Sequence, residues 1–174
     1  MPERSGVITM KGGPLTLVGH EVKVGDIAPD FTAIDTNLAP VRVLSFHGKA
    51  CILSSVVSLD TPVCDTETKR FNDEAARLGP DITILTLSMD LPFAQKRWCG
   101  AAGVTKVQTL SDYRDASFGN AYGVLIKELR LLARAVFLVD KKGIVRHAEI
   151  VPEITSEPDY ASLLGELKKI SAAP

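Results

Sequence analysis

The sequence predicts an α/β fold in which a central mixed sheet is flanked by helices. A strand–helix–strand pattern runs over residues 50–89, and a strand–strand–helix pattern runs over residues 135–170. The first pattern favours parallel strands joined by a crossover helix, and the second favours a hairpin followed by a packed helix. The 174 residues, 45% of them hydrophobic, are enough for one domain with a full core. We therefore expect a single domain over 1–174.

The beginning of the chain predicts an N-terminal β-hairpin extension that covers about residues 1–25. Residues 15–18 and 21–24 flank Gly19-His20 and are typical of two short strands around a tight turn. Residues 25–31 are expected to enter the main domain as an irregular segment.

The next elements are predicted from apolar patterning. The apolar run 50–57 is typical of a strand, and it leads into a helix over 62–78 that ends at Gly79-Pro80. Residues 82–89 predict a second strand. Three shorter elements then follow: a helix from Pro92 that ends near Gly100 or Gly103, a strand over 107–110, and a helix of about ten residues between Ser111-Asp112 and Gly123.

The last third of the chain completes the pattern. Residues 135–139 and 144–150 flank the sequence Asp-Lys-Lys-Gly at 140–143, which is a strong hairpin signal. Residues 156–159 open a final helix that reaches Ile170. A βαβ half followed by a ββα half predicts a thioredoxin-like fold.

The segment Thr61-Pro62-Val63-Cys64 places a thiol in the first turn of a helix. Thr61 can act as the N-cap, and Pro62 suits the first helical position because it has no N–H to leave unpaired. Cys64 is then the third helical residue, where unpaired N–H groups and the helix dipole favour an anion. We expect Cys64 to ionise more easily than a free thiol and to act as a nucleophile. The alternative is the usual one for free cysteine, a small buried apolar residue.

Arg134 interrupts the apolar run 131–139. In a strand it would share a face with Val136 and Leu138, and a charge on an apolar face needs a partner. The partner is either the Cys64 thiolate or, if Arg134 lies at a strand end, solvent water.

Composition narrows the classes of partner. The net charge is −1 and the pI is about 6.3, so no basic excess is available for nucleic acid or an anionic membrane. The three cysteines argue against a secreted disulfide framework, and the N-terminus has no apolar signal region, so we expect a cytoplasmic protein. His20, His47 and His147 have no metal-ligand spacing, so no metal is expected. Cys51 is expected to be an inert core residue.

Several blocks of the chain match one protein family in its order and spacing. They resemble the thiol peroxidase branch of the peroxiredoxins, which are atypical two-cysteine enzymes, and they cover residues 58–64, 69–72, 90–95, 97, 99–101, 121–124, 132–136 and 153–160. The resemblance implies a thioredoxin-like homodimer without metal, haem or flavin. It further implies an antioxidant enzyme that reduces hydrogen peroxide and organic hydroperoxides and is recycled by thioredoxin.

The resemblance also assigns roles to residues. Cys64 matches the peroxidatic cysteine and Cys99 the resolving one, which implies a redox-active Cys64–Cys99 disulfide within one chain. Thr61 and Arg134 match the residues that hold the peroxide and the thiolate, and the backbone N–H groups of Val63 and Cys64 add donors. If the two sulfurs start far apart, the helix turn around Cys99 must unwind, because a disulfide needs Cα atoms within about 7 Å.

One position departs from the family pattern, and some assignments stay open. The family carries a proline seven residues before the peroxidatic cysteine, where this chain has Val57. This change puts in doubt the rate and the shielding of the sulfenic acid. The alternative function is a non-enzymatic thiol switch, which needs no leaving-group stabilisation. Cys99 is alternatively a thiol packed beside Trp98, and Phe93 and Trp98 line a hydroperoxide pocket, a dimer contact or the core.

Overall fold

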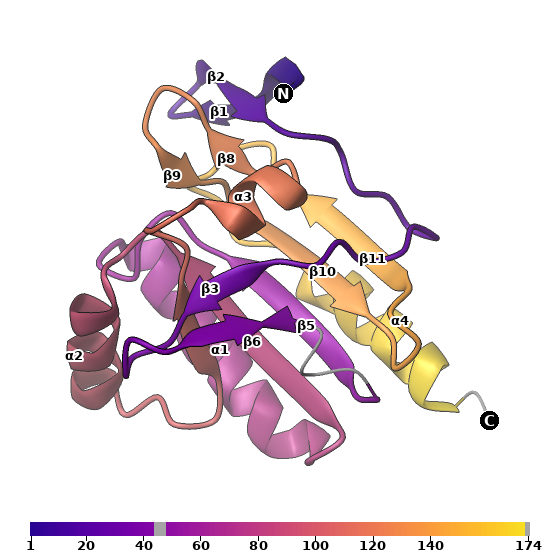
Figure 1. The fold of residues 1–174 in the computed structure, drawn as a ribbon. Coiled ribbons are helices and arrows are strands. Elements are labelled where there is room, and N and C mark those ends of the chain that lie inside the picture. Colours follow the sequence, from indigo (N-terminus) through magenta and orange to yellow (C-terminus); the bar gives the residue numbers. More distant parts are fainter. Residues whose placement is uncertain (44–47, 173–174) are drawn as a thin grey trace.

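The computed structural model describes residues 1–43 and 48–172, which form two sheets and four helices (Figure 1). The strands are β1 (Glu3–Met10), β2 (Gly13–Val18), β3 (Thr32–Ile34), β4 (Pro40–Arg42), β5 (Ala50–Ser55), β6 (Ile82–Ser88), β7 (Gln108–Ser111), β8 (Leu125–Ile126), β9 (Leu131–Leu132), β10 (Ala135–Val139) and β11 (Val145–Ile150). The helices are α1 (Pro62–Leu78), α2 (Pro92–Ala102), α3 (Ser117–Ala121) and α4 (Tyr160–Ala172).

The larger sheet is mixed, with the strand order β11-β10-β5-β6-β7-β3-β4. Its centre is parallel, because β5 pairs with β6 and β6 with β7 in the same direction. Strand β10 runs antiparallel to β5 on one side and to β11 on the other. The predicted mixed sheet, the βαβ unit and the late hairpin are therefore confirmed. Helix α1 has the predicted bounds and ends at Gly79, whose φ is 81°.

Apolar packing covers both faces of this sheet. On one face, Ile52 and Ile84 pack with Phe71 of α1 and Leu163 of α4. On the opposite face, side chains from the sheet pack with α3 and with the N-terminal hairpin, and this core includes Leu53, Leu85, Phe118, Tyr122, Phe137, Ile8 and Leu17. Figure 1 shows the hairpin, β8, β9 and α3 gathered at one end of the large sheet.

The N-terminal hairpin lies within the predicted range of about 1–25, but its strands and its turn differ from those predicted. Its strands are β1 and β2, and its turn is Lys11-Gly12, whose φ angles of 49° and 81° fit the two-residue turn typical of hairpins. Residues 21–24 form no strand. Gly19 instead marks a close approach at the end of β2, because a Cβ there would lie 2.9 Å from the Cα of Gly123. Strand β2 continues the smaller sheet, which has the order β1-β2-β8-β9.

Of the next two helices, α2 ends as predicted and α3 is shorter than predicted. Helix α2 continues through Gly100 and ends at Gly103, which adopts the left-handed conformation with φ 68°. Helix α3 is only five residues long, and Ser111 belongs to β7 instead of capping it. The carboxylate of Asp112 nevertheless accepts the N–H groups of Phe118 and Gly119, so the expected capping group is present at a shorter helix.

Two further observations concern membrane-spanning helices and the histidines. In the part of the chain that the structure describes, no helix combines the length and the apolar character needed to cross a membrane. Of the three histidines, His47 lies outside the described residues.

Candidate active site

Cys64 is the third residue of α1 and is fully buried, with an exposed fraction of 0%. Its Sγ accepts a hydrogen bond from Nη2 of Arg134 at 3.2 Å. The first hydrogen bond of the helical ladder joins the N–H of Asp65 to the carbonyl of Thr61. The N–H groups of Val63 and Cys64 therefore precede the ladder and point to the N-terminal end, which attracts anions. A guanidinium and a helix N-terminus thus both place positive charge beside the sulfur, as reactive thiolates require.

Arg134 is held on every side of its guanidinium group. It lies between β9 and β10, outside any strand, and its exposed fraction is 1%. Its Nε and Nη2 donate to the carbonyl of Ile154 at 3.0 and 2.8 Å, and its Nη1 donates to Glu67. The alternative in which this side chain reaches solvent is therefore wrong. Its position beside Cys64 is the geometry that the proposed catalytic role needs.

Glu67 completes this buried group, and it was not predicted from the sequence. Its carboxylate accepts hydrogen bonds from Arg134 and, at 2.8 Å, from the hydroxyl of Ser54 on β5. Burial raises the pKa of Glu67 to about 7, and this effect outweighs the opposite effects of Arg134 and Ser54. Its spacing was an available signal, because a residue three positions after Cys64 lies on the same face of the helix.

Thr61 occupies the N-cap position without capping the helix through its side chain. Its backbone has φ −90° and ψ 146°, but its hydroxyl donates to the carbonyl of Ser58 at 2.8 Å. The predicted side-chain cap is therefore wrong, because the hydroxyl is directed to the carbonyl of the preceding turn and its oxygen accepts no N–H group of α1. Within the described residues no side chain caps this helix start, which leaves the N–H of Val63 open to a ligand. The Thr61 oxygen keeps lone pairs that accept hydrogen bonds.

Asp90 fixes the loop that carries Thr61, and it is a second residue without a predicted role. Its carboxylate accepts hydrogen bonds from the hydroxyl of Ser58 at 2.7 Å and from the N–H of Leu59 at 2.8 Å. Asp90 itself follows β6, and the hydroxyl of Ser88 also donates to it at 2.8 Å. The turn before α1 is thus attached to the neighbouring parallel strand.

Cys99 lies in the second half of α2 and is partly buried. Its Sγ is 3.6 Å from the hydroxyl oxygen of Thr109 on β7, and it lines a pocket of about 370 Å³ that also contains Lys96. Its carbonyl accepts the N–H groups of Gly103 and Val104 at the helix end. Cys64 and Cys99 are both free thiols here.

The neighbours of Cys99 show how α2 is attached. The indole N–H of Trp98 donates to Asp65 at 3.0 Å, which joins α2 to α1 one residue after Cys64. Trp98 also packs against both apolar cores, whereas Phe93 is 68% exposed. Cys51 lies in the core as predicted, and burial raises its pKa to about 12, so its thiol is protonated at neutral pH.

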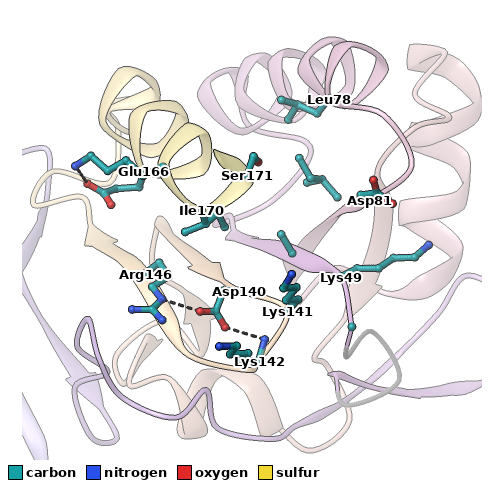
Figure 2. Close-up of a pocket in the computed structure, with 14 residues that line it drawn as sticks. Lys49, Leu78, Asp81, Asp140, Lys141, Lys142, Arg146, Glu166, Ile170 and Ser171 are labelled. Atoms are coloured by element: carbon teal, nitrogen blue, oxygen red, sulfur yellow. Dashed lines mark hydrogen bonds and ion pairs between the residues drawn. The ribbon is translucent and has the colours of Figure 1, made fainter. Parts of the chain in front are cut away.

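The larger of the two cavities described here lies at the opposite end of β5 and is not part of this site. It has a volume of about 840 Å³ and surrounds the start of β5 and β6. Figure 2 shows Lys49, Asp81 and Lys141 around it, with Arg146 paired to Asp140. Cys64 follows the other end of β5, so this cavity does not serve the candidate active site.

Comparison with known proteins agrees with the fold and the residue pattern. The model of the Redoxin family matches residues 23–164, which is most of the chain. The chain belongs to the Redoxin family. One relative, the thiol peroxidase of Bacillus subtilis (strain 168), is 60% identical over 153 residues, which cover 88% of this chain and 91% of the relative.

Solved structures of similar proteins have the same overall fold as this chain. A peroxiredoxin-like protein from Aquifex aeolicus has a TM-score of 0.88 and 42% identity, with 96% of this chain and 97% of that chain covered. A thiol peroxidase from Chromobacterium violaceum has a TM-score of 0.83 over 93% of this chain and 95% of that chain. At 20% identity, that second structure supports the fold alone.

Replacing Glu67 by glutamine is expected to increase the reactivity of Cys64 above about pH 7, where the carboxylate of Glu67 is ionised. The ionised carboxylate competes with the thiolate for Arg134, whereas the amide keeps an acceptor without the charge. We expect faster alkylation of Cys64 in the variant above pH 7, and equal rates well below it, because the carboxyl group of the parent is then neutral as well. Equal alkylation rates of the two proteins above pH 7 would contradict this electrostatic effect.

The same variant also tests the stability effect of Glu67. Its pKa rises on folding from the usual 4.5 to about 7, so the native state binds more protons between these values. Stability therefore falls as pH rises from 4.5 to 7, and Glu67→Gln should remove this fall in urea unfolding series.

Proposed function

We propose that this Redoxin-family protein is a thiol-dependent peroxidase that reduces hydroperoxides at Cys64. The observation that carries the proposal is the hydrogen bond from a fixed, buried Arg134 to a cysteine sulfur at a helix N-terminus. A thiol switch needs no such donor, because it has no departing oxygen to stabilise. The relatives named thiol peroxidase support the same conclusion.

The first step is the attack of the Cys64 thiolate on one peroxide oxygen. A sulfur–oxygen bond forms, the oxygen–oxygen bond breaks, and the second oxygen leaves as hydroxide or alkoxide and takes up a proton. Arg134 and the N–H of Val63 provide positive ends for the departing charge, and one such donor contributes roughly 3–4 kcal/mol. Because the Thr61 hydroxyl already donates to Ser58, its oxygen is suited to accept the peroxide O–H. Cys64 becomes a sulfenic acid.

The burial of Cys64 affects both the access of peroxide to its sulfur and the shielding of that sulfur from water. Cys64 has no solvent-exposed surface, so the side chains over it must move before a peroxide binds. Val57, at the place of the family proline, is 7% exposed and belongs to the same apolar cluster as Cys64 and Leu59. We propose that this buried apolar side chain takes over the shielding that the resemblance assigns to the family proline.

In the second step, we propose that the Cys99 thiol attacks the sulfenic acid of Cys64. A disulfide forms and water leaves, which balances the reaction. For this attack we propose that Cys99 leaves Thr109 and that the hydrogen bonds from Gly103 and Val104 to its carbonyl open. Gly100 and Gly103 lower the cost of this opening because they allow many backbone conformations. A thioredoxin-type dithiol then restores both thiols by exchange. By resemblance we also propose a cytoplasmic homodimer.

Coupled turnover tests the proposal. Purified protein is mixed with hydrogen peroxide, thioredoxin, thioredoxin reductase and NADPH, and NADPH consumption is followed. Cys64→Ser is expected to abolish turnover, and the matched control Cys51→Ala to preserve it, because the Cys51 thiol is protonated and buried. If the wild-type protein is oxidised only once and NADPH consumption then stops, the result would favour a thiol switch instead.

A further inference from the structure

The segment 152–155 connects the N-terminal hairpin to Arg134. Strand β1 pairs with this segment, because the N–H of Thr9 donates to the carbonyl of Pro152 at 2.7 Å and the N–H of Ile154 donates to the carbonyl of Thr9 at 3.0 Å. The carbonyl of Ile154 in turn accepts both Nε and Nη2 of Arg134. The backbone group that holds the guanidinium is therefore itself held by the hairpin.

Glu153 is the side chain that fixes this segment. One carboxylate oxygen accepts the hydroxyl of Thr9 at 3.1 Å and the N–H of Gly12 at 3.0 Å. The other accepts the N–H and the hydroxyl of Thr155 at 2.9 and 2.7 Å. These hydrogen bonds lower the pKa of Glu153 to about 2, so the carboxylate is charged at neutral pH.

The two sides of the carboxylate serve different parts of the molecule. The bonds to Thr9 and Gly12 attach it to the hairpin turn, and the bonds to Thr155 close a tight loop around Ile154. Ile154 is 2% exposed, so its carbonyl direction is set by these neighbours and not by solvent. Arg134 has its remaining contacts with Glu67 and Cys64, which leaves Ile154 as the acceptor that orients its Nε edge.

We propose that Glu153 is a positioning residue for peroxide reduction, and that it acts through the Ile154 carbonyl to aim Arg134 at Cys64. The inference rests on the proposed function, because it assigns a task to the arginine of that site. It gives the N-terminal hairpin a role in catalysis as well as in packing. Small displacements of a positioned catalytic group are costly, since about 1 Å can change a rate by roughly 100-fold.

The chain provides a matched control for a purely structural role. The carboxylate of Glu128 also attaches the hairpin, because it accepts the N–H of Thr16 on β2 at 3.0 Å. Glu128 lies in the loop between β8 and β9, and in the described part of the chain it makes no hydrogen bond or ion pair with residues 152–155. Loss of either carboxylate loosens the hairpin, but only loss of Glu153 is expected to disturb Arg134.

The test compares Glu153→Ala, Glu153→Gln and Glu128→Ala in a Cys99→Ser background, with two reactions of Cys64. Stopped-flow mixing with hydrogen peroxide measures the reaction that needs Arg134 for the departing oxygen. Iodoacetamide alkylation at alkaline pH, where the thiolate is formed in every variant, measures a reaction that has no such oxygen. We expect Glu153→Ala to slow peroxide oxidation about 10-fold or more while alkylation changes less than about 3-fold. Glu153→Gln should fall in between, because its amide oxygen still accepts from Thr9 and Gly12. Glu128→Ala should react as the parent does.

The outcomes distinguish a positioning role of Glu153 from a purely structural role and from failure of the proposed function. Equal peroxide rates for Glu153→Gln, Glu153→Ala and the parent would overturn the inference, and so would an equal slowing in Glu128→Ala. If Glu153→Ala does not fold, the comparison of Glu153→Gln with Glu128→Ala still decides, because an unslowed Glu153→Gln contradicts the role. A parent whose Cys64 stays reduced in peroxide would overturn the proposed function itself, whereas a reactive parent with unaffected Glu153 variants overturns only this inference.

Discussion

Arg134→Met is expected to lower the free energy of unfolding by about 3–5 kcal/mol and to slow peroxide oxidation of Cys64 by roughly 100-fold or more. The stability loss arises because Glu67 is fully buried and loses the partner of its charge. The rate loss arises because Nη2 is the side-chain donor at the Cys64 sulfur. Urea unfolding and stopped-flow oxidation measure the two effects separately.

A double variant separates stability from chemistry. Adding Glu67→Gln to Arg134→Met removes the uncompensated buried carboxylate, so most of the lost stability should return. The oxidation rate should not return, because the donor to the departing oxygen is still absent. Recovery of both properties together would mean that Arg134 acts only through folding, and would contradict its catalytic assignment.

Cys99→Ser is expected to stop thioredoxin-coupled turnover while the first oxidation of Cys64 keeps its rate. The sulfur of Cys99 contacts Thr109 and does not contact Arg134 or Cys64 in the described structure, so its loss leaves the peroxide site intact. Without a resolving thiol, the sulfenic acid persists or is oxidised further to sulfinic acid. Coupled NADPH consumption and mass spectrometry of the Cys64 peptide measure the two outcomes.

A matched substitution controls for disturbance of α2. Thr109→Val removes the hydroxyl beside Cys99 but keeps the thiol, so recycling should continue. Normal thioredoxin-coupled turnover in Cys99→Ser would show that another thiol resolves the sulfenic acid, or that thioredoxin attacks it directly.

Elements with strong local signals could be predicted from the sequence, and those that depend on contacts could not. Pro62 and Gly79 mark the ends of α1 by backbone chemistry, so its bounds were predictable. The N-terminal hairpin was misplaced because Gly19 looks like a turn residue but is required by its approach to Gly123. Strands such as β8 and β9, two residues each, are too short to show a period.

In the candidate site, too, some residues could be predicted from local sequence signals and others could not. The helix-start signal at Thr61 and Cys64 and the misplaced charge of Arg134 are visible in sequence because each breaks an expected pattern. Glu67 lies three residues after Cys64 in the helix, but its burial and its ion pair with Arg134 could not be predicted from that spacing alone. Glu153 acts through backbone groups of distant segments, and no spacing in the chain indicates such bonds.

The most direct test of the account is a single-turnover experiment on the reduced protein. One equivalent of cumene hydroperoxide is added, free thiols are trapped by alkylation at millisecond to second times, and the peptides are mapped by mass. The account predicts a rapid Cys64–Cys99 disulfide that is absent in Cys64→Ser, with Cys51 remaining a free thiol. A Cys64 that stays reduced for minutes would contradict the peroxidase mechanism, and a lasting sulfenic acid on Cys64 would contradict the role of Cys99.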